Sequence, residues 1–247
     1  MKKWFTFTLA VVLVVCVLSG CAGQPSAPSA SPTDTTPTST TAAPDAIDDY
    51  GTPDIQTAAH KETATYGDSN IEYVQLIGLP DIEVQEYLNN QIKIFCEWPT
   101  VDQENPDKTV TVTANYTIIG KYISIRTTDL TTIPGAAYPV SNVRGITFNL
   151  QDGEHVSLNL VIDGTDGLHS AITNGKLKQI EPDSIVPGAA DKFAQELNAY
   201  SEFYLTKTAI CFPIQGENHT TGDYWVFEAK YNDIKESLTP DFAKVLD

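Results

Sequence analysis

Basic residues are scarce in this sequence: 15 lysines and arginines stand against 32 aspartates and glutamates, which gives a formal net charge of −17. A chain this acidic repels the phosphates of nucleic acids, so nucleic acid is excluded as a partner. A cationic partner would instead be attracted and steered toward the surface. The other interpretation of the charge is that it only keeps a surface protein soluble.

The signatures of several enzyme classes are also missing. None of the four histidines, His60, His155, His169 and His219, has His-x-x-x-His spacing, and neither His-Glu-x-x-His nor Gly-x-Ser-x-Gly occurs. The stretch DGTDG at 163–167 begins like a calcium loop but lacks the remaining ligands, so we interpret it as a helix-capping turn. The sequence therefore predicts no catalytic residue, no metal site and no cofactor.

No apolar run reaches the ~20 residues that a membrane-spanning helix needs. A basic start and the short apolar run Leu9–Leu18 are typical of a secretory signal. The next residues, Leu18-Ser19-Gly20-Cys21, resemble the lipobox of bacterial lipoproteins, whose cysteine receives a diacylglyceryl thioether and becomes the first mature residue. We therefore predict a lipoprotein signal peptide at 1–20 and lipidation of Cys21, which holds the chain on the extracellular face of the cell membrane. The alternatives are an ordinary signal peptide with an incidental cysteine and an uncleaved anchor.

Only three other cysteines occur. Cys16 lies in the predicted signal peptide, and Cys96 and Cys211 lie in the apolar stretches KIFCEW and AICFPI. An extracytoplasmic compartment permits a disulfide, and spacing alone does not decide whether the two thiols meet. The apolar surroundings favour two buried free thiols.

Residues 21–49 have almost none of the apolar residues that form a core. They consist mainly of Ser, Thr, Pro, Ala and Asp, a composition that cannot offset the entropy cost of ordering the chain. We predict a lipid-anchored linker that lifts a domain away from the membrane. Cleavage after Gly20 also removes two lysines and brings the formal charge to −19.

The remaining 50–247 is long enough for a sizeable core, and we divide it into modules at 50–165 and 166–247 that pack as one unit. Alternating apolar residues predict strands at 54–65 and 71–79 and hairpins at 108–130 and 145–159, the latter turning at Asp152-Gly153. A helix at 79–98, capped by Asp81 and stopped by Pro99, is predicted from its apolar face.

The second half alternates in the same irregular way. The pattern predicts helices at 166–179 and 189–199, strands at 201–214 and 223–231 separated by a polar loop, and a short helix at 232–238. Strand-rich stretches interrupted by helices, without regular βαβ alternation, predict an α+β fold with largely antiparallel sheets.

Two groups of stretches resemble a known pair of extracytoplasmic modules. The first group is YVQLIGLPDIEVQEYLNNQI, VTANYTIIGKYISIRTT, PGAAYP and ITFNLQDGEHVSLNLVI; the second is EFYLTKTAICFPI with GDYWVFEAKYNDIKESL. The chain is similar here to the lysozyme-binding anti-sigma factor of Gram-positive bacteria and to the non-catalytic part of a peptidoglycan deacetylase. The resemblance implies an extracellular binding or sensing module near the cell wall.

The chain departs from this family at one loop. Family members commonly carry Gly-Gly-Ala-His-Pro where this chain has Gly-Ala-Ala-Tyr-Pro at 135–139, so Tyr138 replaces the histidine. The loop before Tyr224 is also more polar than in relatives.

We therefore predict a lipid-anchored binding or sensing protein of the cell envelope, whose partner is a cationic secreted protein such as lysozyme or a cell-wall glycan. Loops 134–144 and 215–223 are the candidate partner-binding surfaces, and their candidate residues are Tyr138, Asn142, Glu217, His219 and Tyr224. The alternative is a hydrolase of glycan or peptidoglycan that uses two carboxylates ~5–9 Å apart. A purely structural role in a surface complex is a third hypothesis.

Overall fold

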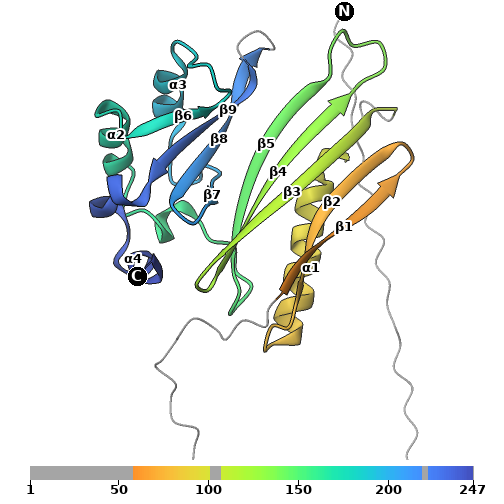
Figure 1. The fold of residues 1–247 in the computed structure, drawn as a ribbon, viewed down its shortest axis with the longest axis horizontal. Helices are drawn as coiled ribbons and strands as arrows, with labels where there is room; N and C mark the ends of the chain where they lie inside the picture. Colours follow the sequence, from red (N-terminus) through yellow and green to blue (C-terminus); the bar gives the residue numbers. More distant parts are fainter. Residues whose placement is uncertain (1–57, 101–106, 219–221, 247) are drawn as a thin grey trace, which may run out of the picture. The chain divides into compact units, whose positions relative to one another are not determined.

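The computed structural model describes residues 58–100, 107–218 and 222–246, all of them within one compact unit, Asp48–Asp247. Two sheets of five and four strands form its framework (Figure 1). The first sheet has the order β1-β2-β3-β4-β5. Its strands are β1 Ala58–Tyr66, β2 Ser69–Ile77, β3 Thr109–Ile119, β4 Tyr122–Thr132 and β5 Val140–Asn149. Neighbouring strands are antiparallel except β2 and β3.

Helix α1, Ile82–Glu97, covers one face of the first sheet. It starts after Asp81, whose carboxylate accepts hydrogen bonds from the backbone N–H groups of Glu83 and Val84. Its apolar face buries Leu88 and Ile92 in a cluster with side chains of β2 to β5. The helix ends in a 3-10 turn, Trp98–Thr100, at Pro99. The predicted helix, cap and stop are therefore confirmed.

The cap of α1 yields a first prediction. Replacing Asp81 by alanine leaves two N–H groups at the start of the helix without their acceptor, and we expect a loss of about 1 kcal/mol in the free energy of unfolding. Urea denaturation measures this loss. Asp81→Asn is the matched control, because asparagine also accepts these hydrogen bonds, and it should retain most of the stability; an equal loss in both variants would contradict the capping role.

The second sheet has the order β6-β9-β8-β7 and is antiparallel throughout. Its strands are β6 Leu177–Glu181, β7 Tyr204–Leu205, β8 Ala209–Asn218 and β9 Gly222–Lys230. Helices α2 Asp166–Thr173, α3 Ala189–Glu196 and α4 Pro240–Leu246 lie around this sheet (Figure 1). A large apolar cluster joins them to it, and Phe193 of α3 stacks on Phe227 of β9 at a centroid distance of 4.7 Å.

The two sheets meet along β4 and β5, at a contact that we call the seam. Residues 141, 143, 145 and 147 of β5 face the second sheet, because alternate side chains of a strand point to opposite faces. Val143 packs there against Tyr204, Cys211 and Val226. Ser124 of β4 accepts a hydrogen bond from the backbone N–H of Leu205 at 2.7 Å, so the sheets are also joined by a buried hydrogen bond.

The α+β class with largely antiparallel sheets is confirmed, but several local predictions are wrong. The strand predicted at 201–214 is two antiparallel strands, β7 and β8, and the helix predicted at 232–238 is two 3-10 turns, Tyr231–Asp233 and Lys235–Ser237. The predicted helix 166–179 ends at Thr173, and Leu177–Glu181 is strand β6. The second hairpin is incomplete, because after the turn at Gly153 only His155 bridges to Phe148 before the chain enters a 3-10 turn at Leu158–Leu160. The polar loop before β9 is shorter than predicted, because β8 continues to Asn218.

Cys96 and Cys211 are both buried and unbridged. Cys96 belongs to the cluster beneath α1, whereas Cys211 belongs to the seam. Burial raises the pKa of each thiol to about 12, so neither is a reactive thiolate near neutral pH. No helix among the described residues is long and apolar enough to cross a membrane.

Candidate functional site

The two loops singled out in the sequence adjoin at the seam. The backbone N–H of Ser141, at the start of β5, donates to Oδ2 of Asp223 at the start of β9, at 2.8 Å. Asn142 follows on β5, and Tyr224 follows on β9, where it packs against the seam cluster. The structure therefore brings two of the predicted site residues, Asn142 and Tyr224, to the same seam.

The other predicted site residues are placed differently. Tyr138 lies in the loop between β4 and β5 and is 66% exposed. Glu217 is an exposed residue near the end of β8. Cys21 and His219 lie outside the described residues, so their roles stay predictions.

An ion pair crosses the seam. Arg126 of β4 donates from one terminal nitrogen to both carboxylate oxygens of Glu181 at the end of β6, at 2.9 and 2.7 Å. The guanidinium also lies 5.7 Å from the ring centroid of Tyr204. Burial raises the pKa of Tyr224, and the neighbouring Glu181 raises it further. The pair thus ties the first sheet to the second beside the two loops.

Breaking this ion pair should loosen the seam. We expect Arg126→Met to lower the free energy of unfolding by about 1–3 kcal/mol, because side chains that are 25% and 29% exposed lie between the surface and buried cases. A double-mutant cycle with Glu181→Gln isolates the interaction. If Arg126 and Glu181 interact as the structure shows, the cycle should give a coupling energy of about 1 kcal/mol or more. Additive effects of the two substitutions on the free energy of unfolding would contradict this interaction.

A groove runs along the outer edge of β5, between that strand and the segment 196–203. It consists of two hollows of about 320 and 520 Å³ that share Arg144, Ser201 and Glu202. We call this the seam groove. Its remaining polar lining includes Asn142, Ser157, His155, Glu196, Asn198 and Gln215, and its apolar lining includes Phe95, Ile146, Leu158, Tyr200 and Ile214. β5 is the last strand of its sheet, so its outer edge faces the groove.

The charged groups of the groove compensate one another. Arg144 lies over the ring of Phe95 at 4.4 Å and donates to the backbone carbonyl of Phe95. Burial lowers the pKa of Arg144, while the negative charges of Glu202 and Asp129 raise it. Glu196 is bound by Lys192 at 2.9 Å.

The remaining titratable group of the groove is an imidazole. Desolvation lowers the pKa of His155, an effect that the charge of Glu202 partly opposes. His155 is therefore neutral near pH 7, so the charged side chains that line the groove are Arg144, Glu196 and Glu202, of which Lys192 compensates Glu196.

A buried polar set lies behind the groove. Strand pairing places Thr127 opposite Arg144 and Asp129 opposite Asn142, so all four side chains lie on the α1 face of the sheet. Thr127 is 0% and Asp129 5% exposed. Among the described residues, Thr127 Oγ1, Asp129 Oδ1 and Arg144 Nε have no hydrogen-bond partner. A folded protein rarely leaves such atoms unsatisfied, so this set is the most unusual polar feature of the described chain.

Another hollow, of about 580 Å³, lies between α2 and the segment 232–237. It is larger than either part of the groove, but it contains none of the predicted site residues and none of the unsatisfied buried side-chain atoms. We therefore take the seam groove as the candidate site. Within the described residues, no group of histidine, cysteine and carboxylate side chains is arranged to hold a metal.

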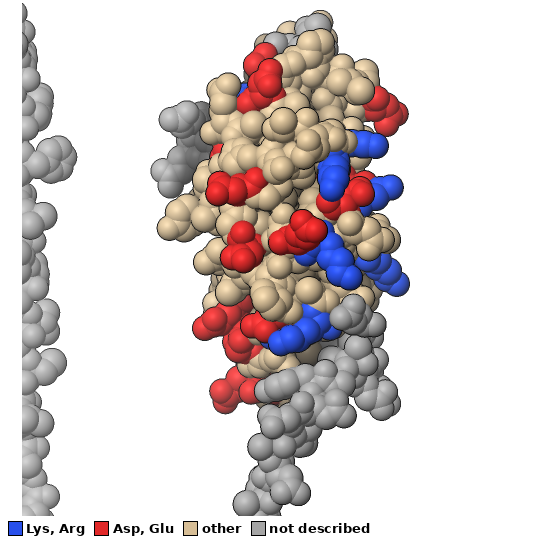
Figure 2. Space-filling view, turned by 90° about the vertical axis from the view of Figure 1, so that its left-hand side faces the viewer, with Lys and Arg blue, Asp and Glu red and all other residues tan. Residues whose placement is uncertain are grey.

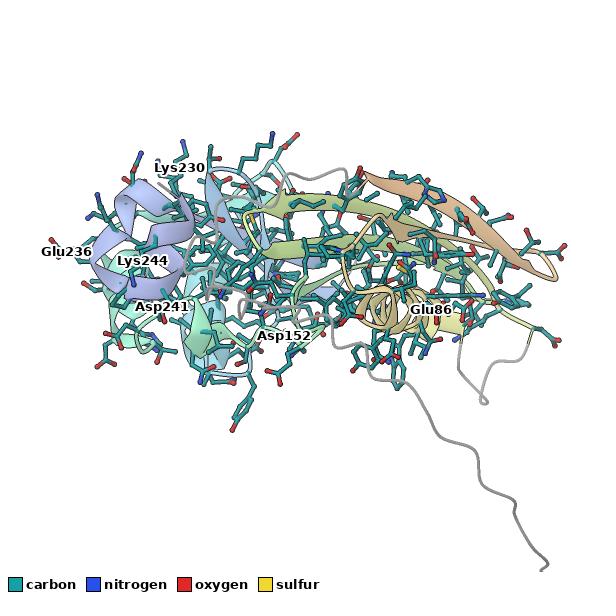
Figure 3. The ribbon with its side chains drawn as sticks, turned by 90° about the horizontal axis from the view of Figure 1, so that it is seen from below. Glu86, Asp152, Lys230, Glu236, Asp241 and Lys244 are labelled. Atoms are coloured by element: carbon teal, nitrogen blue, oxygen red, sulfur yellow. The ribbon has the colours of Figure 1, made fainter. Side chains whose placement is uncertain are left out.

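Surface charge is mixed on the face that carries the helices of the second sheet. Figure 2 shows acidic side chains spread over this face, with Lys and Arg gathered along one side of it. Figure 3 shows Asp241 and Lys244 close together on α4, where they form an ion pair at 3.2 Å. The acidity of the chain is thus distributed on this face and does not form a single patch.

Comparisons with known proteins give structural similarity only. No known family profile and no curated protein sequence matches this chain. A crystal structure of a DUF3298 family member from Bacteroides fragilis aligns with a TM-score of 0.48 and 13% identity, over 76% of this chain and 95% of that one. A DUF3298 family protein from Pseudomonas aeruginosa aligns with a TM-score of 0.46 and 10% identity, over 75% and 96%.

Sequence reasoning missed four groove residues: Arg144, His155, Tyr200 and Glu202. A signal for the first was present, because Arg126 and Arg144 are the only arginines in the sequence, and Arg144 ends the loop 134–144, directly before a predicted strand. An arginine within an alternating strand must either reach solvent or find a carboxylate. The other three lie in irregular segments, whose folding onto β5 leaves no pattern in the sequence.

Proposed function

We propose that this chain is a non-catalytic, lipid-anchored binding protein of the cell envelope, and that the seam groove is its ligand site. The observation that carries the proposal is the groove itself. Both of its hollows have the volume of small ligand sites, ~300–1,000 Å³, and combine apolar walls with a few fixed polar groups. Its walls come from β5 and from the elements around the second sheet, so a rigid seam supports them.

The envelope location rests on the N-terminal sequence. The basic start, the short apolar run and the sequence ending in Cys21 support export and lipidation. The polar linker that follows provides a tether between membrane and domain. A diacyl anchor supplies two chains, which suffices for stable attachment. Metabolic labelling with a palmitate analogue tests this part: label should enter the wild type and be absent from Cys21→Ala.

The arrangement of carboxylates supports a binding role over glycan hydrolysis. A glycosidase needs one carboxyl group held neutral as the acid and a second group across the scissile bond. In the groove, Glu196 is bound by Lys192, and the negative charge of Glu202 acts on Arg144. Asp129, whose pKa burial raises to about 6, does not line the groove. We therefore propose that the bound ligand is left uncleaved.

The ligand is either a cationic secreted protein such as lysozyme or a wall component. The resemblance noted in the sequence favours lysozyme, and the formal charge would accelerate its encounter. The ion pair between Lys192 and Glu196 at the groove favours a neutral ligand instead. Two assays with the chain from residue 22 onward therefore decide between them.

The first assay measures binding to hen lysozyme at low and at moderate salt, and the second measures sedimentation with purified peptidoglycan sacculi. Binding to either that survives moderate salt, with no release of sugar from the sacculi, is the expected result. Attraction to lysozyme that disappears on modest screening would be charge attraction alone. Binding to neither partner would overturn the proposed function, and release of reducing sugar would overturn its non-catalytic part.

A further inference from the structure

We propose that the seam groove binds a neutral, N-acetylated glycan strand. This inference rests on the proposed function for its location at the wall and adds the chemical class of the ligand. Two features of the groove support it: the balance of its charges and the kind of side chains that line it.

The charge balance argues against a charged ligand. A cationic protein surface would find no acidic patch in the groove, because Glu196 is bound by Lys192 and the negative charge of Glu202 acts on Arg144. An anionic ligand would meet the same two carboxylates. A neutral ligand leaves the Lys192–Glu196 ion pair intact, so it avoids the cost of leaving a desolvated charge uncompensated.

The lining suits hydroxyl and amide groups. Asn142 presents a side-chain amide, which both donates and accepts, and Ser157 and Ser201 present hydroxyls. Gln215 adds its amide oxygen, because its nitrogen donates to the carbonyl of Asp223, whereas the amide of Asn198 is already bonded to the backbone of Glu196 and Tyr200. A sugar ring carries many groups that donate and accept, while an acetamido group adds one N–H and one carbonyl. Such a ligand can use side chains of this kind throughout the length of the groove.

One aromatic ring stands at the rim. Tyr200 lines the larger hollow and is 92% exposed, although an aromatic side chain usually buries most of its surface. It lies in the segment between α3 and β7, next to Ser201 and Glu202. A flat apolar ring with a polar tip can pack against the apolar face of a pyranose, while the amides and hydroxyls bind its edge.

The test titrates the chain from residue 22 onward with chitotetraose, a neutral N-acetylated probe, by isothermal calorimetry. Its deacetylated counterpart, which is cationic, is the matched ligand. Tyr200→Ala is the groove variant, and Tyr138→Ala is its control, because Tyr138 is also strongly exposed but lies outside the groove. Both positions are on the surface, so neither change should affect folding.

We expect chitotetraose to bind, the deacetylated probe to bind at least tenfold more weakly, and Tyr200→Ala to lower the affinity for chitotetraose at least tenfold. Tyr138→Ala should stay within twofold of the wild type. Equal or tighter binding of the deacetylated probe, or equal effects of the two tyrosine variants, would overturn the inference. If chitotetraose does not bind while lysozyme or sacculi do, the inference fails and the proposed function stands; if nothing binds, both fail.

Discussion

Replacing Gly145 by valine is expected to destabilise the protein by about 3 kcal/mol or more, the largest effect that we anticipate for a single substitution. A Cβ atom at this position would lie 2.6 Å from the carbonyl carbon and oxygen of Phe203 and 2.9 Å from the backbone nitrogen of Tyr204. These are backbone atoms at the start of β7, and they cannot rotate away as the tip of a side chain could. Relief of the clash requires the two sheets to separate.

Separation of the sheets would expose the seam. Tyr204, Cys211, Val226 and Val143 are all less than one-tenth exposed, and each would gain contact with water. Urea denaturation of Gly145→Val, with Val140→Ile as control, measures the effect. Val140 lies on the same strand but is 38% exposed, so its change should be within about 0.5 kcal/mol. A loss below 1 kcal/mol in Gly145→Val would show that the sheets do not depend on this close approach.

The second large effect concerns Asp129. Burial raises its pKa from 3.8 to about 6, against the opposing charges of Arg144 and Lys108. Between pH 3.8 and about 6, the carboxyl group of Asp129 therefore keeps its proton in the folded state and loses it in the unfolded state. The protonated carboxyl group makes its full contribution to the free energy of unfolding below about pH 4, and this contribution is lost as the pH rises through about 6. At neutral pH the buried, ionised carboxylate lowers stability.

Asp129→Asn should therefore stabilise the protein at pH 7.5 by up to about 3 kcal/mol, because asparagine resembles the protonated carboxyl group. The gain should shrink as the pH falls and approach zero below about pH 4. Unfolding measured across this range tests both statements, with Asp183→Asn, an exposed aspartate, as a control that should show no such trend. A loss of stability at neutral pH would instead mean that Arg144 and Lys108 stabilise the ionised carboxylate by more than its burial costs.

The elements with strong local signals were predictable from the sequence. Helix α1 has a cap at Asp81, an apolar face and a stop at Pro99, and the first hairpin turns at Gly120 in the left-handed region, with φ of 52°. Strand β6 was mistaken for the end of a helix, because its five residues continue the apolar pattern of α2 and their pairing with β9 is distant in sequence. Local periodicity cannot report such a partner.

The candidate site was predictable only in part. Loops 134–144 and 215–223 were singled out separately, and the structure joins them through the hydrogen bond between Ser141 and Asp223; Asn142 lines the groove. The groove itself depends on how the irregular segment 196–203 lies against β5, and this depends on the close approach at Gly145. A glycine within an alternating strand is a signal of such an approach, but its partner can be named only from the fold.

The central claim is that ligand binds in the seam groove. Amide hydrogen exchange, measured on the chain from residue 22 onward with and without solubilised peptidoglycan fragments, tests it most directly. The account predicts slower exchange with ligand in peptides covering 142–146 and 196–203. Protection confined to 167–176 and 232–237, around the other hollow, would contradict it.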